Sequence, residues 1–386
     1  MAISNRVGPP VTGDDFYGRV KELSQAHDYL RTNHSLVLSA PRRIGKSSFA
    51  KRLIEDQKAL GWSCVYIDLE GVRTQEDFLK ILINEFDKSG IWSEAATKVG
   101  GMANRLIEAI KGIGPVKFDF THRESSENLY TSLFEVIDHS KDTLIVIDEL
   151  TLFLNILDRE EGRRESEFFL NWFRSLRQVT NSKIRWIFCG SVGLHNFTRS
   201  RSLSMTINDM VSFDFDALSN AEANGLVEAL SEGEKIPIDQ EIRNFILNKI
   251  EWYVPYFIQL LFTNIKDYPN SRKGITKEIV DDAYERLVRS DDLGTWGERL
   301  TEYNGQEPGA KIILKELSKS AEGLSRDQLF AIFSLNTGLS SYDADNQLSL
   351  ILNMLEHDGY IMRAKGGIRC FRSSLLKQWW YYKFVE

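Results

Sequence analysis

The sequence predicts an α/β protein whose N-terminal half is a parallel β-sheet covered by helices and whose C-terminal half is mainly helical. Three observations support this. Up to about residue 215, short apolar runs alternate with amphipathic helical patterns, which is typical of βαβ units. The apolar runs then stop, and helical patterns continue to about residue 288. The last 80 residues predict three helices, a β-hairpin and a final helix.

The N-terminal elements follow from these patterns in order. A turn and an amphipathic helix are expected at 14–31, and Thr74 with Asp77 has the spacing that caps a helix reaching about residue 86. Further helices are expected at 46–60, 128–140 and 163–180, and strands at 35–40, 64–70, 143–150, 185–191 and 211–215. Because the strands are apolar along their whole length, we expect a sheet that is covered on both faces.

The C-terminal elements are more regular. Ser219 and Glu222 have the capping-box spacing and open a helical region, and the breaker cluster at 305–309 indicates a linker. Three helices (310–319, 325–334 and 342–357) and a hairpin with a Gly-Gly turn then follow in the order of a winged helix. We therefore predict three domains: 1–215, with an insertion at 88–128 that could contain a strand at 114–121; 216–304; and 305–386.

Composition excludes several classes of protein. The 386 residues are 42% hydrophobic and 27% charged, no apolar run approaches the ~18 residues of a membrane span, and the N-terminal residues lack a signal-peptide core. We expect a cytoplasmic protein with no membrane partner. The net charge of −7 excludes a protein that coats nucleic acid over its whole surface, and the three cysteines lack the CxxC spacing of a zinc site.

A phosphate-binding loop follows the first predicted strand and opens a helix. Residues 40–47 match the pattern G-x-x-x-x-G-K-[ST] except at the first position, where alanine replaces glycine. The residues are Ala40, Pro41, Arg42, Arg43, Ile44, Gly45, Lys46 and Ser47, and Ser48 follows them. Backbone N–H groups of such a loop point at phosphates, Lys46 would reach the β- and γ-phosphates, and Ser47 would bind Mg²⁺. Alanine at position 40 is tolerated if its φ stays negative. We predict ATP and Mg²⁺ as cofactors.

A buried strand ending in two carboxylates completes the predicted site. In LIVIDE, Asp148 and Glu149 follow four apolar residues, so both lie at the carboxyl edge of the sheet, where open α/β sheets bind ligands. Asp148 would hold Mg²⁺, and Glu149 would polarise the attacking water. The alternative is a pair of solvated acids at a strand end.

Several positions have weaker support. Ser191 ends the strand at 185–191 and could sense the γ-phosphate, or it could be a turn cap. Arg199 and Arg201 could reach the phosphate of a neighbouring subunit, or they could form a solvated basic loop; Arg174 and Arg177 are weaker alternatives. The pair Phe16 and Tyr17 could pack on adenine or staple the first helix.

Taken together, these residues resemble the archaeal-type ATPase family, which is close to the STAND and origin-initiator ATPases of the AAA+ group. The resemblance rests on DDFYGRVKEL, APRRIGKSS, LIVIDEL, IFCGS, WYVPYFIQLL and IRCFRSSLLKQWWYYKF. It implies a nucleotide-binding core, a helical lid and a winged helix, with Pro255 near the nucleotide. Tyr253 stands where many members have glycine, and WYVPYFIQLL lacks the sensor arginine of many AAA+ lids, which favours a switch that turns ATP over slowly.

The charge of the predicted winged helix divides between two surfaces. The segment 342–358, which contains its third helix, carries four acidic residues and no Lys or Arg, which would repel a phosphate backbone, whereas residues 361–386 contain six basic residues and one acidic residue. DNA contact is possible through the basic wing, at Arg363, Lys365, Arg369 and Arg372. The wing could equally bind a protein partner or an acidic surface of this chain.

Two functional hypotheses follow. The first is a STAND-like switch in which ATP controls partner binding or self-assembly into a homo-oligomer. The alternative is a DNA-linked ATPase, such as a loader, a transposition helper or a component of a mobile element or defence system.

Overall fold

The computed structural model describes residues 2–91, 134, 141–190, 193–303 and 305–386. The predicted strand at 114–121, the predicted helix at 128–140 and Ser191 lie outside these residues, apart from Phe134. The chain divides into two compact units. One contains 20–40 and 46–215 and is called the sheet unit here. The other contains 1–19, 41–45 and 216–386 and is called the helical unit.

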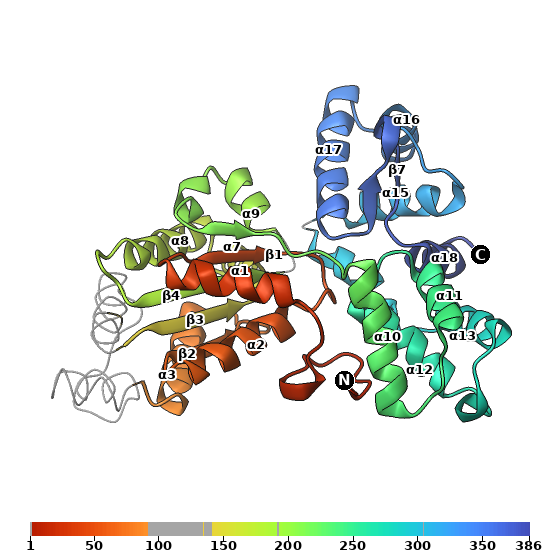
Figure 1. Ribbon diagram of the computed structural model, residues 1–386. Coiled ribbons are helices and arrows are strands. Elements are labelled where there is room, and N and C mark those ends of the chain that lie inside the picture. Colours follow the sequence, from red (N-terminus) through yellow and green to blue (C-terminus); the bar gives the residue numbers. More distant parts are fainter. Residues whose placement is uncertain (1, 92–133, 135–140, 191–192, 304) are drawn as a thin grey trace. The chain divides into compact units, whose positions relative to one another are not determined.

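The sheet unit is built on five parallel strands in the order β2-β3-β4-β1-β5 (Figure 1). The strands are β1 (Leu36–Ser39), β2 (Ser63–Asp68), β3 (Thr143–Asp148), β4 (Ile184–Gly190) and β5 (Val211–Phe213). Each was predicted from a short apolar run, and β3 and β4 are buried at every position, as expected for strands covered on both faces.

Helices cover the two faces of this sheet. They are α1 (Val20–Arg31), α2 (Lys46–Ala59), α3 (Gln75–Lys88), α7 (Leu150–Glu160), α8 (Arg163–Arg177) and α9 (Leu194–Ser200). One face packs an aromatic-rich core against α3, α7 and α8, in which Trp186 of β4 lies 5.3 Å from Phe173 of α8 between ring centres. On the other face, Phe49 of α2 stacks on Phe213 of β5.

Local chemistry explains where these helices begin. The Thr74 hydroxyl accepts a hydrogen bond from the Asp77 backbone N–H and caps α3, as its spacing predicts. The sequence did not reveal α7, which starts directly after β3. Its N-cap is Glu149, whose φ of 54° lies in the left-handed region and turns the chain sharply from strand to helix.

The helical unit begins with a short 3₁₀ turn (Gly13–Asp15) and continues with α10 (Asn220–Glu234), α11 (Gln240–Ile250), α12 (Pro255–Lys266), α13 (Lys277–Arg289) and α14 (Gly294–Glu298). The predicted capping box at Ser219 and Glu222 opens α10. Among the described residues, this unit also contains short 3₁₀ segments at Ser271–Lys273, Arg299–Glu302 and Lys365–Gly367.

The C-terminal elements of this unit occur in the predicted order. Helices α15 (Glu307–Lys319), α16 (Arg326–Thr337) and α17 (Ser341–His357) precede the antiparallel strands β6 (Ile361–Arg363) and β7 (Arg369–Phe371) and helix α18 (Ser374–Phe384). The predicted linker at 305–309 is partly wrong, because α15 already begins at Glu307. Pro308 fits the first helical turn, where its missing N–H has no partner to lose.

Candidate nucleotide-binding site

The phosphate loop connects β1 to α2. Ala40 is buried and its backbone is outside the left-handed region, so the missing glycine is tolerated as predicted. Gly45 takes a φ of 101°, which strongly favours glycine. Lys46 is the first residue of α2, is only 6% exposed, and donates a hydrogen bond from Nζ to the Ala40 carbonyl oxygen at 2.7 Å.

Ser47 and Asp148 meet at the carboxyl edge of the sheet. The Ser47 hydroxyl donates to Oδ2 of Asp148 at 2.7 Å, across 101 residues of sequence. The backbone N–H of Glu149 donates to Oδ1 at 3.0 Å, and the hydroxyl of Tyr66 donates to the same Oδ2 as Ser47. Asp148 is only 3% exposed, so these donors stabilise a nearly buried carboxylate. Sequence reasoning did not identify Tyr66.

Negative charge is concentrated at this edge. Asp68 pairs in register with Asp148 on the neighbouring strand. Burial raises the pKa of the Asp68 carboxyl, and the charges of Asp148 and Glu149 raise it further. Burial, and then the negative charge of Asp148, also raises the pKa of Tyr66, which keeps its hydroxyl protonated. A group of hard oxygen donors with excess negative charge fits Mg²⁺, and Ser47 and Asp148 would hold it.

The loop residues between Pro41 and Gly45 group with the helical unit. The Arg43 guanidinium lies 4.6 Å from the ring centre of Tyr256, and its Nη1 donates to the Gly8 carbonyl at 3.2 Å. Arg42 forms a loose ion pair of 4.0 Å with Glu302. Both arginine side chains therefore contact protein groups of this unit.

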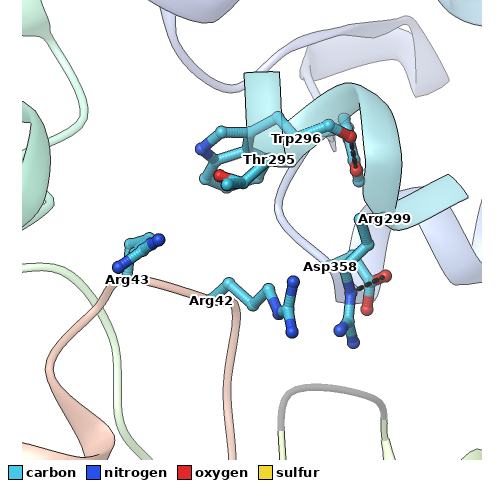
Figure 2. Close-up of a pocket in the computed structure, with 7 residues that line it drawn as sticks. Arg42, Arg43, Thr295, Trp296, Arg299 and Asp358 are labelled. Atoms are coloured by element: carbon cyan, nitrogen blue, oxygen red, sulfur yellow. Dashed lines mark hydrogen bonds and ion pairs between the residues drawn. The ribbon is translucent and has the colours of Figure 1, made fainter. Parts of the chain in front are cut away.

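Figure 2 shows a pocket on this side of the loop. It is lined by Arg42, Arg43, Thr295, Trp296, Arg299, Asp358 and Tyr360. At its wall the nearly buried Arg299 contacts Asp358 at 3.4 Å, and the Tyr303 hydroxyl donates to the same Asp358 oxygen at 2.9 Å. Burial, followed by the charge of Asp358, holds the pKa of Tyr303 well above its usual value. The pocket thus combines arginines of the phosphate loop with a buried ion pair of the C-terminal half.

Of the arginines with weaker predicted support, one is exposed and two are held by acidic partners. Arg199 is exposed at the end of α9. Arg201 pairs with Asp158 and lies 3.7 Å from the ring centre of Phe197. Arg177 pairs with Asp209 at 2.8 Å, and Arg174 lies on the same helix as Arg177.

The residues proposed to contact adenine lie in the helical unit. Phe16 is 9% exposed, and Pro255 is the first residue of α12. The Tyr17 hydroxyl lies so close to Gly225 of α10 that a Cβ there would be 1.9 Å away. The adenine role of these residues stays a prediction.

The basic hairpin is less available than its composition indicates. The Arg369 side chain is 9% exposed and contacts Glu356 at 3.2 Å. Arg372 contacts Asp216 at 2.7 Å and lies 4.7 Å from the ring centre of Trp252. Of the four predicted DNA contacts, Arg363 and Lys365 are exposed, and Arg363 lies 3.9 Å from Glu356.

Comparison with known proteins agrees with this geometry. Residues 29–197 match the family described as AAA domain. The Walker-type ATPase of Pyrococcus abyssi has a similar structure, with a TM-score of 0.67 at 12% identity over 97% of this chain and 99% of that one. The Aeropyrum pernix ORC2 protein, in complexes with ADPNP and ADP, gives a TM-score of 0.55 at 12% identity, with 96% and 92% covered.

One curated relative matches by sequence. The tRNA modification GTPase MnmE of Borrelia turicatae is 24% identical over 272 residues, which cover 67% of this chain and 52% of the relative. The chain thus matches about half the length of that protein. Within the described residues, no helix combines the length and apolar composition that a membrane crossing requires.

Proposed function

We propose that this chain is an AAA-type P-loop ATPase, which the match of residues 29–197 to the AAA domain family supports, and that it binds ATP with Mg²⁺, hydrolyses it slowly and acts as a nucleotide-controlled switch. The observation that carries the proposal is the contact between Ser47 and Asp148, beside Lys46 at the start of α2. A hydroxyl, a carboxylate and an ammonium group at one helix N-terminus are what a nucleotide triphosphate with a divalent cation requires.

Each residue of the cluster has a distinct role in this proposal. The Lys46 ammonium and the backbone N–H groups of the loop bind the β- and γ-phosphates. Ser47 directs its proton to Asp148, which leaves its oxygen lone pairs for the cation. Bound Mg²⁺ would neutralise charge on the transferred phosphate. Glu149 accepts the proton of the attacking water.

The switch interpretation is favoured over rapid cycling by features of the helical unit. Helix α12 contains no arginine, and α17 carries Asp343, Asp345 and Glu356 but no Lys or Arg, which disfavours a nucleic-acid partner on that helix. We propose residues 1–215, 216–304 and 305–386 as core, lid and winged helix, whose arrangement responds to ATP and exposes a surface for a protein partner or a second copy.

The first test is nucleotide binding and steady-state hydrolysis with purified protein. Wild type should bind ATP, Lys46→Ala should lose this binding, and Glu149→Gln should retain it while hydrolysis falls about 100-fold or more. GTP belongs in the same experiment, since the curated relative is a GTPase. If Lys46→Ala binds ATP as well as wild type does, the proposed site is wrong.

A second measurement tests the switch. Size-exclusion chromatography with light scattering should show an assembly state, or binding of a partner once one is found, that differs between ATP and ADP. Lys46→Ala should remove this difference. An assembly state that ignores nucleotide in wild type would contradict the switch while leaving the ATPase intact.

The alternative is a DNA-linked ATPase, and the exposed Arg363 and Lys365 favour it. Neutralising about two phosphates predicts a slope of about −2 for log K against log salt, compared with about −5 if all six basic residues after position 360 made contact. Stimulation of hydrolysis by duplex DNA that is lost in Arg363→Glu with Lys365→Glu would favour this alternative. Binding without salt dependence would count against it.

A further inference from the structure

Tyr66 lies on the face of the sheet that carries the proposed site. In β2, Val65 and Ile67 point into the aromatic core with α3, α7 and α8, so Tyr66 and Asp68 point to the opposite face. Lys51 of α2 lies 5.1 Å from the centre of the Tyr66 ring on that face. The pairing of β2 with β3 places Tyr66 opposite Val146, two residues before Asp148, within reach of that carboxylate.

We propose that Tyr66 is a positioning residue for the magnesium site, because its hydroxyl holds the Asp148 carboxylate in the orientation that directs Ser47. This inference rests on the proposed ATP site and adds a residue to it. Tyr66 acts through Asp148, and no contact between Tyr66 and nucleotide is required.

The argument starts from the freedom of an aspartate side chain. The terminal torsion of aspartate is broad, so its hydrogen-bond partners determine how the carboxylate is turned. Oδ1 of Asp148 accepts from the Glu149 backbone, and Oδ2 accepts from both Ser47 and Tyr66. Of the two hydroxyls that donate to Oδ2 within the described part of the chain, removal of Tyr66 would leave Ser47, which is the group that Asp148 has to orient.

The orientation of Ser47 matters because its hydroxyl has one proton and two lone pairs. While the proton points at Oδ2, the lone pairs point elsewhere and can bind a cation. If the carboxylate turns, the hydroxyl turns with it and the oxygen donor is no longer preorganised. Tyr66 therefore contributes to the affinity for Mg²⁺ together with nucleotide, and not to nucleotide affinity in the absence of Mg²⁺.

The test is equilibrium binding of a fluorescent ATP analogue titrated with Mg²⁺, in a Glu149→Gln background that blocks hydrolysis. Tyr66→Phe removes one hydroxyl and keeps the ring. We expect it to raise the Mg²⁺ concentration for half-maximal binding by about three- to tenfold, which is within the range for the loss of one ordinary hydrogen bond. Binding in EDTA should not change.

Two controls separate positioning from packing. Tyr29→Phe removes the same atom from another half-buried tyrosine of the sheet unit and should leave the Mg²⁺ midpoint unchanged. In an Asp148→Asn background, adding Tyr66→Phe should have no further effect on that midpoint, since the carboxylate through which it acts is gone.

An unchanged Mg²⁺ midpoint in Tyr66→Phe would overturn the inference, as would an equal loss of binding with and without Mg²⁺. Either result leaves the proposed function standing if Lys46→Ala still abolishes binding. If binding is independent of Lys46, the proposed function itself fails. A thermal melt of each variant establishes that the titrated protein is folded.

Discussion

Gly359 is a position where a single methyl group should be costly. It follows α17 and has a φ of 82°, at which a non-glycine residue costs about 1–2 kcal/mol. A Cβ there would lie 2.5 Å from Cη2 of Trp252 and 3.0 Å from Cγ of Pro41 in the phosphate loop. Trp252 is buried and packs edge-on against Trp296, so it cannot move aside freely. Overpacking of this kind costs a further ~1–3 kcal/mol.

We therefore expect Gly359→Ala to destabilise the helical unit by about 2–5 kcal/mol. Gly366→Ala is the matched control, because Gly366 has a similar φ of 75° and a Cβ there would meet nothing within 4 Å. The effect of alanine on the unfolded chain is the same for both and cancels in the difference. Urea unfolding followed by tryptophan fluorescence measures each variant. Equal losses would refute the reasoning, because the close approach to Trp252 and Pro41 would then have no energetic consequence.

Two further predictions concern ion pairs, one in each unit. Asp358→Asn removes a buried partner of Arg299 and should lower the free energy of unfolding in urea by about 3–5 kcal/mol. Adding Arg299→Met should recover part of this loss, because the second charge is then no longer buried without a partner. Additive losses from the two substitutions would contradict a paired role. For Asp209, burial alone would raise the pKa, but the hydrogen bonds and charge of Arg177 outweigh it and hold the pKa below its usual value. The ion pair of Asp209 therefore stabilises the fold above the unfolded-state pKa of this carboxyl, and this stabilisation is lost as pH falls through the folded-state pKa. Between about pH 5 and 3, Asp209→Asn should consequently lose less stability than wild type in urea unfolding. Parallel curves of unfolding free energy against pH for the two proteins would exclude this linkage.

The parallel strands could be predicted because burial on both faces makes each one a continuous apolar run. The same property concealed α7. Leu150 to Leu157 resumes the apolar character of β3 after the two carboxylates, and composition does not show that this second apolar stretch is helical. The change from strand to helix depends on a left-handed residue, which side-chain patterns do not reveal. The predicted linker at 305–309 overlaps the start of α15, because that prediction treats proline as a helix breaker. Proline does break a helix in its interior, but Pro308 lies in the first turn, where it is tolerated.

The site could be predicted where its chemistry is local. The phosphate loop is contiguous in sequence, and Asp148 ends an unmistakable buried strand. Tyr66 was missed because its role depends on the pairing of β2 with β3, although its place two residues before Asp68 on one strand was a usable signal. The wing was overestimated because composition counts every arginine as exposed. Folding places Glu356 beside Arg369 and removes that charge from the surface.

Glu149 shows how a proposed catalytic role can conflict with stability. Its left-handed backbone costs about 1–2 kcal/mol, whereas glycine in its place would relieve this strain and lose roughly 0.5–1 kcal/mol through the entropy of the unfolded chain. Glu149→Gly should therefore leave stability unchanged or raise it by up to about 1.5 kcal/mol. Glu55→Gly, at an exposed position within right-handed α2, should cost about 1 kcal/mol. If Glu149→Gly is as destabilising as Glu55→Gly, then the Glu149 side chain stabilises the fold, and its presence needs no catalytic explanation. If Glu149→Gly leaves stability unchanged while hydrolysis is lost, then glutamate is retained at a strained backbone position for a reason other than stability. This is expected of a residue that acts on the attacking water.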